Sequence, residues 1–185
     1  KGEIWFAVIE REGVATSAVL TDILTSAMAD MPWPKSMRWG AQGFRWVRPL
    51  HSVLAILDGT AIDFAVDLQG ADMQAGNLTS GHRFLAPDAI AVSNFADYRE
   101  KLRDAKVIID SAERRAIIER ELKAQAEAEG LTVRDDPALL DEVAGLIEWP
   151  VPLIGSIDAQ FMDVPAEALT SSMRAHQKYF SLLNA

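Results

Sequence analysis

VLAILDGTAIDFAVDL, residues 53–68, consists of two apolar segments separated by an aspartate and a glycine. The segments Val53–Leu57 and Ala61–Leu68 are rich in residues that favour strands. An Asp-Gly pair between two such segments is the strongest short signal for a hairpin, because the tight turn needs positive φ at both of its central residues. We therefore expect an antiparallel hairpin that turns at Asp58-Gly59.

Strands and helices are expected on both sides of this hairpin. Strand-like segments lie at Ile4–Ile9, Ala89–Val92, Val107–Ile109 and residues 178–183, whereas the glycine-containing residues 69–84 are typical of a loop. Apolar periodicity and end signals such as Asn94, Ser111, Gly130 and Pro137 predict helices over Val14–Met28, Phe95–Ala105, Ala112–Glu129, Pro137–Ile147 and Pro165–Gln177. Because these elements intermix without strict alternation, the expected class is α+β, with a mixed or antiparallel sheet and flanking helices. Residues 1–185 are expected to form a single α+β domain or part of one, as a fragment of a longer protein.

Composition excludes several classes of protein. The chain has a net charge of −9 and is 49% hydrophobic, enough for a core, but no apolar run approaches the length of a membrane helix. No cysteine is present, which excludes disulfides and thiolate metal sites and fits a cytoplasmic location. The three histidines lack ligand-spaced partners, so no metal site is expected. The chain also lacks a phosphate-binding P-loop, a dinucleotide-binding turn and a nucleophile elbow.

One segment, PKSMRWGAQGFRWVRPLH at residues 34–51, carries a local positive charge in this acidic chain. It contains four cations and no carboxylate, and tryptophans lie among them; the cations are Lys35, Arg38, Arg45 and Arg48. Cations neutralise phosphates and aromatic faces stack on bases, so the pattern is a plausible footprint for single-stranded or acceptor-end RNA. In the alternative interpretation, which local composition slightly favours, Arg38 and Arg45 stack on Trp39 and Trp46, or the cations pair with carboxylates elsewhere.

Two further clusters carry candidate polar residues. In SGHRF, residues 80–84, His82 and Arg83 either face a partner or pair internally within a tight turn. SSMRAHQKYF, residues 171–180, places Arg174, His176 and Lys178 near the expected end of a helix. Cations at that end either complement the helix dipole or hold a phosphate. No catalytic residue is assigned.

These clusters, in this order, resemble a known family. PKSMRWG, RWVRPLHSVLAILDG, GHRFL, AKVIIDSAERRAII, LLDEVAGLIEWPVPLIGSID and SSMRAHQKYF are similar to the N-terminal part of the β subunit of bacterial glycyl-tRNA synthetase. The likeness runs from about Met31 to Phe180.

The resemblance implies a heterotetramer of two α and two β subunits. It implies that the α subunit holds the class II active site and uses ATP and Mg, so no cofactor is expected in this fragment. The β subunit mainly binds tRNA, and its N-terminal region is similar in fold to the editing-type module of the phenylalanyl-tRNA synthetase β subunit. The implied partners are the α subunit, the rest of the β subunit and tRNA-Gly, with neither DNA nor a membrane.

Three hypotheses for the fragment follow. The leading one is a non-catalytic part of glycine–tRNA ligase that handles tRNA and supports subunit assembly. The second is a hydrolytic editing module for mischarged tRNA, with His82 or His176 positioning a water molecule. The third is a domain that contacts only other protein surfaces.

Overall fold

In the computed structural model of the chain, Asp58-Gly59 forms the expected turn of a hairpin, but the hairpin is shorter than predicted. Both residues have positive φ, 50° at Asp58 and 80° at Gly59, as the tight hairpin turn requires. The turn joins β2 (Ile56–Leu57) to the antiparallel β3 (Thr60–Ala61). The outer parts of both predicted arms, Val53–Leu54 and Ala65–Leu68, pair with another strand instead of with each other. The structure describes residues 4–10, 12–39, 43–68 and 71–184.

Contacts within the chain divide it into two compact units. The first comprises Lys1–Thr79 and Ala91–Phe95, and the second comprises Ser80–Ile90 and Ala96–Ala185. A further two-stranded sheet is formed by β6 (Leu78–Ser80) and β7 (Ala89–Ala91). The prediction of one domain or part of one stays a prediction.

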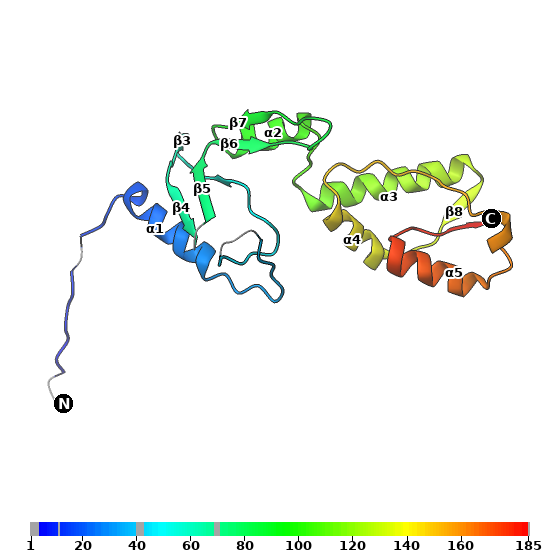
Figure 1. Ribbon diagram of the computed structural model, residues 1–185, viewed down its shortest axis with the longest axis horizontal. Coiled ribbons are helices and arrows are strands. Elements are labelled where there is room, and N and C mark those ends of the chain that lie inside the picture. The colour runs from blue at the N-terminus through cyan, green and yellow to red at the C-terminus, as the bar shows by residue number, and fades with distance from the viewer. Residues whose placement is uncertain (1–3, 11, 40–42, 69–70, 185) are drawn as a thin grey trace. The chain divides into compact units, whose positions relative to one another are not determined.

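The first unit is built on a three-stranded mixed sheet. Its order is β1-β5-β4, and the strands are β1 (Val53–Leu54), β5 (Ala71–Gly76) and β4 (Ala65–Leu68). β5 pairs parallel with β1 and antiparallel with β4, and helix α1 (Thr16–Ala29) contacts β4 (Figure 1). The buried side chains of this unit form one hydrophobic core, made by Phe44, Ala55, Phe64, Val66 and Ala75. The apolar face of α1 joins this core through Leu24 and Met28.

Two predictions for the first unit are wrong. Ile4–Ile9 has no strand conformation and its large apolar side chains are exposed, because no neighbouring strand pairs with its backbone in the described structure. Residues 69–84 are not one loop, since β5 and β6 fall within them. β5 becomes a strand because both of its edges find hydrogen-bonding neighbours, a tertiary effect that overrides its weak local preference.

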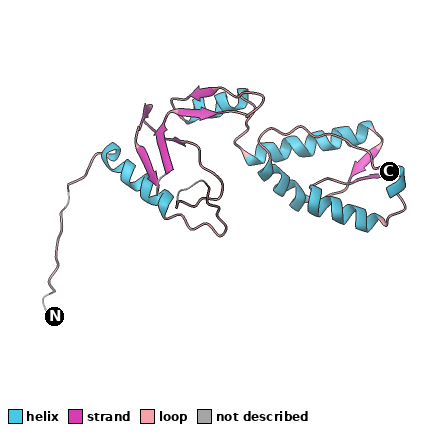
Figure 2. Ribbon diagram, viewed as in Figure 1, coloured by secondary structure: helices cyan, strands magenta, loops and turns pink. Residues whose placement is uncertain are grey.

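The second unit contains most of the helices (Figure 2). Its elements are α2 (Phe95–Asp104), α3 (Ser111–Ala128), β8 (Leu131–Val133), α4 (Pro137–Leu146), the 3₁₀ turn η1 (Ala159–Phe161), α5 (Ala166–Ser172), the π-helical turn η2 (Met173–Gln177) and β9 (Leu182–Asn184). Helices α3 and α4 pack on each other through Ile118, Leu140 and Ala144, and β8 pairs antiparallel with β9. The guanidinium of Arg114 fastens this arrangement by donating to the carbonyls of Ala144, Ile108 and Ile109 at 2.5–2.8 Å.

In this unit the predicted helices agree with the structure more closely than the predicted strands do. The predicted strand Val107–Ile109 is wrong, because its backbone groups do not pair with a strand. The carbonyls of Ile108 and Ile109 accept from the Arg114 side chain, and the Ile108 N–H donates to the Glu148 carbonyl. Asp110, not Ser111, caps α3, since its carboxylate accepts from the backbone N–H groups of Ala112 and Glu113. The last strand lies at Leu182–Asn184, overlapping the expected residues 178–183 at their end.

The secondary structure confirms the α+β class, with helices and small antiparallel or mixed sheets. Among the residues that the structure describes, no helix has both the length and the apolar character needed to cross a bilayer.

Candidate functional site

The cationic segment, residues 34–51, folds back on itself as an irregular ribbon in the first unit. Met37 and Trp46 form an antiparallel bridge, in which the Met37 N–H donates to the Trp46 carbonyl at 2.8 Å and the Trp46 N–H returns the bond at 3.2 Å. Arg38 follows Met37 and Arg45 precedes Trp46 in the sequence. The bridge therefore joins the two arms of the segment beside these two cations.

The aromatic residues of the segment pack on one another. Trp33 meets Trp46 edge to face with ring centroids 4.9 Å apart, and Phe44 stacks on Trp46 at 5.7 Å. Trp39 meets Phe44 edge to face at 5.8 Å, and Phe44 is a buried member of the core. In the described part of the chain no arginine stacks on Trp39 or Trp46, so that expectation is not met. The rings anchor the segment to the core.

The cations of the segment face the solvent. All four are exposed and, within the described residues, none forms an ion pair; they are Lys35, Arg38, Arg45 and Arg48. The Arg45 guanidinium donates to the hydroxyl and the carbonyl of Ser36 at 3.1 and 3.3 Å, and Arg48 donates to the carbonyl of Val47 at 2.8 Å. These neutral acceptors hold two guanidinium groups without neutralising them, so the segment presents uncompensated positive charge.

His82 and Arg83 belong to a tight turn. The Nδ1 atom of the His82 ring accepts from the backbone N–H groups of Phe84 at 3.3 Å and Leu85 at 3.2 Å. The backbone N–H of His82 donates to the carbonyl of Ala105 at 2.9 Å. Arg83 is exposed, with its guanidinium 5.4 Å from the centre of the Phe84 ring. The internal contacts that the sequence analysis left open are therefore present at His82.

The structure does not bring Arg174, His176 and Lys178 to one place. Arg174 pairs with the carboxylate of Asp136 through both Nε and Nη2, and Lys178 pairs with Glu142 at 2.7 Å. His176 is exposed in η2. Two of these three candidates thus carry carboxylate partners, whereas the cations of residues 34–51 have none among the residues that the structure describes.

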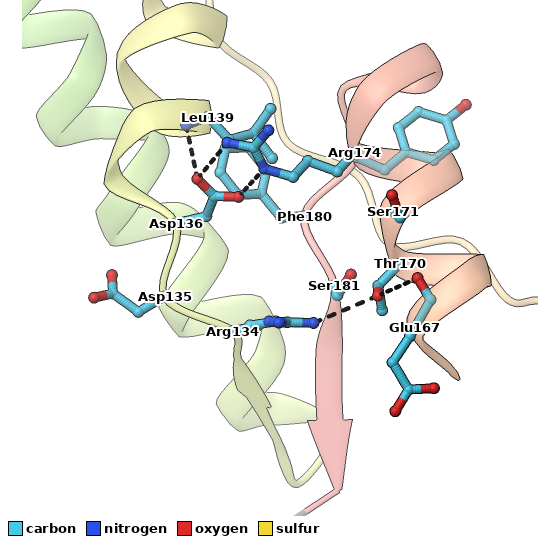
Figure 3. Close-up of a pocket in the computed structure, with 11 residues that line it drawn as sticks. Arg134, Asp135, Asp136, Leu139, Glu167, Thr170, Ser171, Arg174, Phe180 and Ser181 are labelled. Carbon is cyan, nitrogen blue, oxygen red and sulfur yellow. Dashed lines mark hydrogen bonds and ion pairs between the residues drawn. The ribbon is translucent and has the colours of Figure 1, made fainter. Parts of the chain in front are cut away.

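A pocket of about 330 Å³ opens in the second unit beside Arg174 (Figure 3). Its lining mixes two guanidinium groups, three carboxylates, hydroxyls and aromatic rings, contributed by Arg134, Asp135, Asp136, Leu139, Glu167, Thr170, Ser171, Arg174, Tyr179, Phe180 and Ser181. The sequence analysis did not select Arg134, whose guanidinium contacts the Thr170 hydroxyl at 3.4 Å. These two residues are 36 positions apart in the sequence, so no local pattern could indicate that their side chains meet. The excess of carboxylates makes this pocket a poorer place for an anion than the cationic segment.

Asp136 links the start of α4 to the π-helical turn. Its carboxylate accepts from the Leu139 N–H at 2.9 Å and from Arg174. These hydrogen bonds, with Arg174 contributing most, lower the pKa of Asp136 from 3.8 to about 2. The ionised carboxylate therefore stabilises the folded state above about pH 4, and this contribution is lost as the pH falls towards 2.

We expect Asp136→Asn to flatten the acid limb of the stability curve. The wild-type chain should lose more unfolding free energy between pH 5 and pH 2 than the variant, because the variant has no carboxylate to protonate. Urea unfolding at stepped pH measures this difference. Arg174→Gln should reduce the pH dependence too, since it removes the main cause of the shift. Equal acid limbs for all three proteins would contradict the assignment.

Within the described residues, histidine and carboxylate side chains form no group of three that could hold a metal ion. Of the candidate sites, the cationic segment has the exposure and the charge of a polyanion-binding surface.

The chain belongs to the glycyl-tRNA synthetase β subunit family, whose model matches residues 1–185. It is 50% identical to the glycine–tRNA ligase β subunit of Rhodospirillum centenum over 98% of this chain, and 50% identical to that of Paracoccus denitrificans over all of it. The Ruegeria protein of the same name is 49% identical, again over the whole chain. The chain covers 28%, 27% and 27% of these three relatives, so it spans roughly a quarter of their length.

Proposed function

We propose that this chain is a tRNA-handling and scaffolding part of glycine–tRNA ligase. In this proposal its partners are tRNA-Gly, the α subunit and the rest of the β subunit, in the cytoplasm, and neither DNA nor a membrane is bound. Activation of glycine with ATP and Mg takes place on the α subunit, and this fragment does no bond-making chemistry. Family membership supports the assignment to the ligase.

The observation that carries the RNA part of the proposal is the exposure of four cations on one short segment, none of which pairs with a described carboxylate. An acidic chain repels nucleic acid in general, so a local site must supply its own positive charge. Surface cations that already hold carboxylates, such as Arg115 with Asp141 and Glu119, have less charge to offer. The cations of residues 34–51 have no such partner among the described residues, which favours a polyanion as theirs.

The scaffolding part of the proposal is supported by Ile4–Ile9. Its large side chains are exposed, and Trp5 keeps 91% of its surface accessible. A run of apolar side chains in water is an unfavourable surface unless another protein surface covers it. The proposed occupant is another part of the ligase.

Neutralising the cationic segment in the intact ligase tests the proposal. In the variant carrying Lys35→Gln, Arg38→Gln, Arg45→Gln and Arg48→Gln, we expect the KM for tRNA-Gly to rise roughly tenfold to a few hundredfold, as loss of about four phosphate contacts implies. The rate of glycyl-adenylate formation and the kcat at saturating tRNA should not change. Steady-state glycylation and adenylate assays provide these values.

A matched control removes the same charge elsewhere. The exposed cations Arg99, Arg103, Arg120 and Lys123 lie on α2 and α3, and their replacement by glutamine changes the net charge equally. This control should leave the KM for tRNA near the wild-type value. A rise of similar size in both variants would show a general charge effect and refute the proposed site.

A further inference from the structure

The turn at residues 81–86 is held in place by contacts of its backbone. Gly81 approaches Ala105 so closely that a Cβ at residue 81 would lie 2.4 Å from the Cβ of Ala105. The backbone N–H of His82 donates to the Ala105 carbonyl at 2.9 Å, and the His82 carbonyl accepts from the Ala86 N–H at 2.8 Å. These contacts give the turn a defined conformation.

The His82 ring fixes the two apolar residues that follow Arg83 in this turn. Its Nδ1 accepts from the backbone N–H groups of Phe84 at 3.3 Å and Leu85 at 3.2 Å. Both residues are nevertheless exposed, since Phe84 keeps 79% of its surface accessible and Leu85 keeps 62%. A single exposed apolar residue is ordinary, but here hydrogen bonds hold two adjacent ones in water. This arrangement indicates a surface that a partner covers.

Arg83 adds a positive charge beside the Phe84 ring. Its guanidinium carbon lies 5.4 Å from the ring centre, within the range of a cation–π contact. Arg83 is exposed and pairs with no carboxylate among the residues that the structure describes. Phe84 could not keep 79% of its surface accessible if both faces of its ring were covered. The turn therefore displays an open aromatic face next to an uncompensated charge.

A nucleotide in single-stranded RNA supplies a matching group for each of these two side chains. Its base stacks on an aromatic face, and its phosphate accepts hydrogen bonds from a guanidinium group. A protein pocket that enclosed Phe84 would also bury the neighbouring charge of Arg83, which is unfavourable unless the pocket supplies a carboxylate. The pair of side chains thus fits RNA better than an apolar protein pocket.

We propose that Phe84 stacks on an unpaired base of tRNA-Gly and that Arg83 binds a phosphate beside that base. This inference rests on the proposed function and adds to it a contact of a different kind from the phosphate contacts of residues 34–51. The stacking contact tolerates any base, because every base has an aromatic face.

Filter binding of tRNA-Gly to the intact ligase at several salt concentrations separates the two contacts. Phe84→Ala should raise the Kd about fivefold to a hundredfold, as the loss of one stacked base implies, and should leave the slope of log Kd against log salt concentration unchanged. Arg83→Gln should make that slope shallower by about one, since it removes one phosphate contact. An unchanged Kd for Phe84→Ala would overturn the stacking. An unchanged slope for Arg83→Gln would overturn the phosphate contact.

Two further substitutions at Phe84 distinguish stacking on RNA from insertion into a protein pocket. Phe84→Trp keeps an aromatic face and should keep the wild-type Kd, whereas Phe84→Leu is apolar without a ring and should lose most of the affinity that Phe84→Ala loses. A protein pocket would accept leucine and exclude the larger indole. This reversed order, with release of the α subunit from Phe84→Trp on gel filtration, would overturn the inference in favour of a protein partner.

Phe95→Ala is the matched control. Phe95 is 72% exposed, and in the described part of the chain no cation lies over its ring. Its replacement should leave the Kd for tRNA-Gly unchanged. A loss as large as that of Phe84→Ala would show a general effect of removing exposed rings and would overturn the proposed contact.

The two proposals fail separately. An unchanged KM for tRNA-Gly in the variant that lacks the four cations refutes the site at residues 34–51, whatever the result at Phe84. A raised KM in that variant, together with an unchanged Kd for Phe84→Ala, refutes the stacking alone.

Discussion

Replacing Leu139 by alanine is expected to lower the unfolding free energy by about 2–5 kcal/mol. Leu139 is 1% exposed in α4, and its N–H donates to the capping carboxylate of Asp136. Truncation leaves a cavity that the packed surroundings fill only in part, so both the transfer energy and the cavity contribute to the loss. Urea unfolding followed by circular dichroism measures this change.

Leu146→Ala in the same helix is the matched control. Leu146 is 65% exposed, so the same truncation removes little buried surface and should cost no more than about 0.5 kcal/mol. Similar losses for the two variants would contradict the structure, in which Leu139 is buried and Leu146 is exposed at the end of α4.

The second large effect is expected at Gly81. A Cβ atom at this position would lie 2.4 Å from the Cβ of Ala105 and 2.8 Å from its carbonyl oxygen. The neighbouring His82 N–H donates to that same carbonyl at 2.9 Å, so the two backbones cannot separate without loss of a hydrogen bond. Gly81→Ala should therefore cost about 1–3 kcal/mol or more through overpacking.

Gly145→Ala offers the opposite expectation. A Cβ at Gly145 meets nothing within 4 Å, and the residue lies within α4, where alanine is the better helix former. This variant should gain up to about 1 kcal/mol. Thermal unfolding of both glycine variants compares them directly, and a stable Gly81→Ala protein would show that the turn at residues 81–86 is placed wrongly.

Local signals account for the elements that were predicted well. Asp58 and Gly59 adopt the positive φ values of a tight hairpin turn, and Pro137 follows the capping Asp136 at the start of α4. Gly130 follows α3 with a φ of 69°, the left-handed conformation that ends many helices. Each of these signals acts over a few residues, which is why the sequence alone is enough.

The misjudged elements depend on distant partners. Ala71–Gly76 contains few residues that favour strands, yet it pairs with strands on both edges. Ile4–Ile9 has the opposite combination, since it is rich in strand-forming residues but has no paired strand in the described structure. Strand formation thus follows pairing more closely than composition.

The site divides in the same way. The cluster of cations at residues 34–51 is visible in the sequence, because it depends only on composition. The packing of Trp33 and Trp46 on each other, and the bridge between Met37 and Trp46, depend on the fold of the segment. The pairing of Arg174 with Asp136 joins residues 38 positions apart, beyond the reach of local pattern.

The salt dependence of tRNA-Gly binding tests the central claim most directly, that the cations of residues 34–51 face outward to bind a polyanion. The slope of log K against log salt concentration should become shallower by about three when Lys35, Arg38, Arg45 and Arg48 are replaced by glutamine in the intact ligase. Parallel lines for the wild-type and the variant, with the fold unchanged, would contradict the claim.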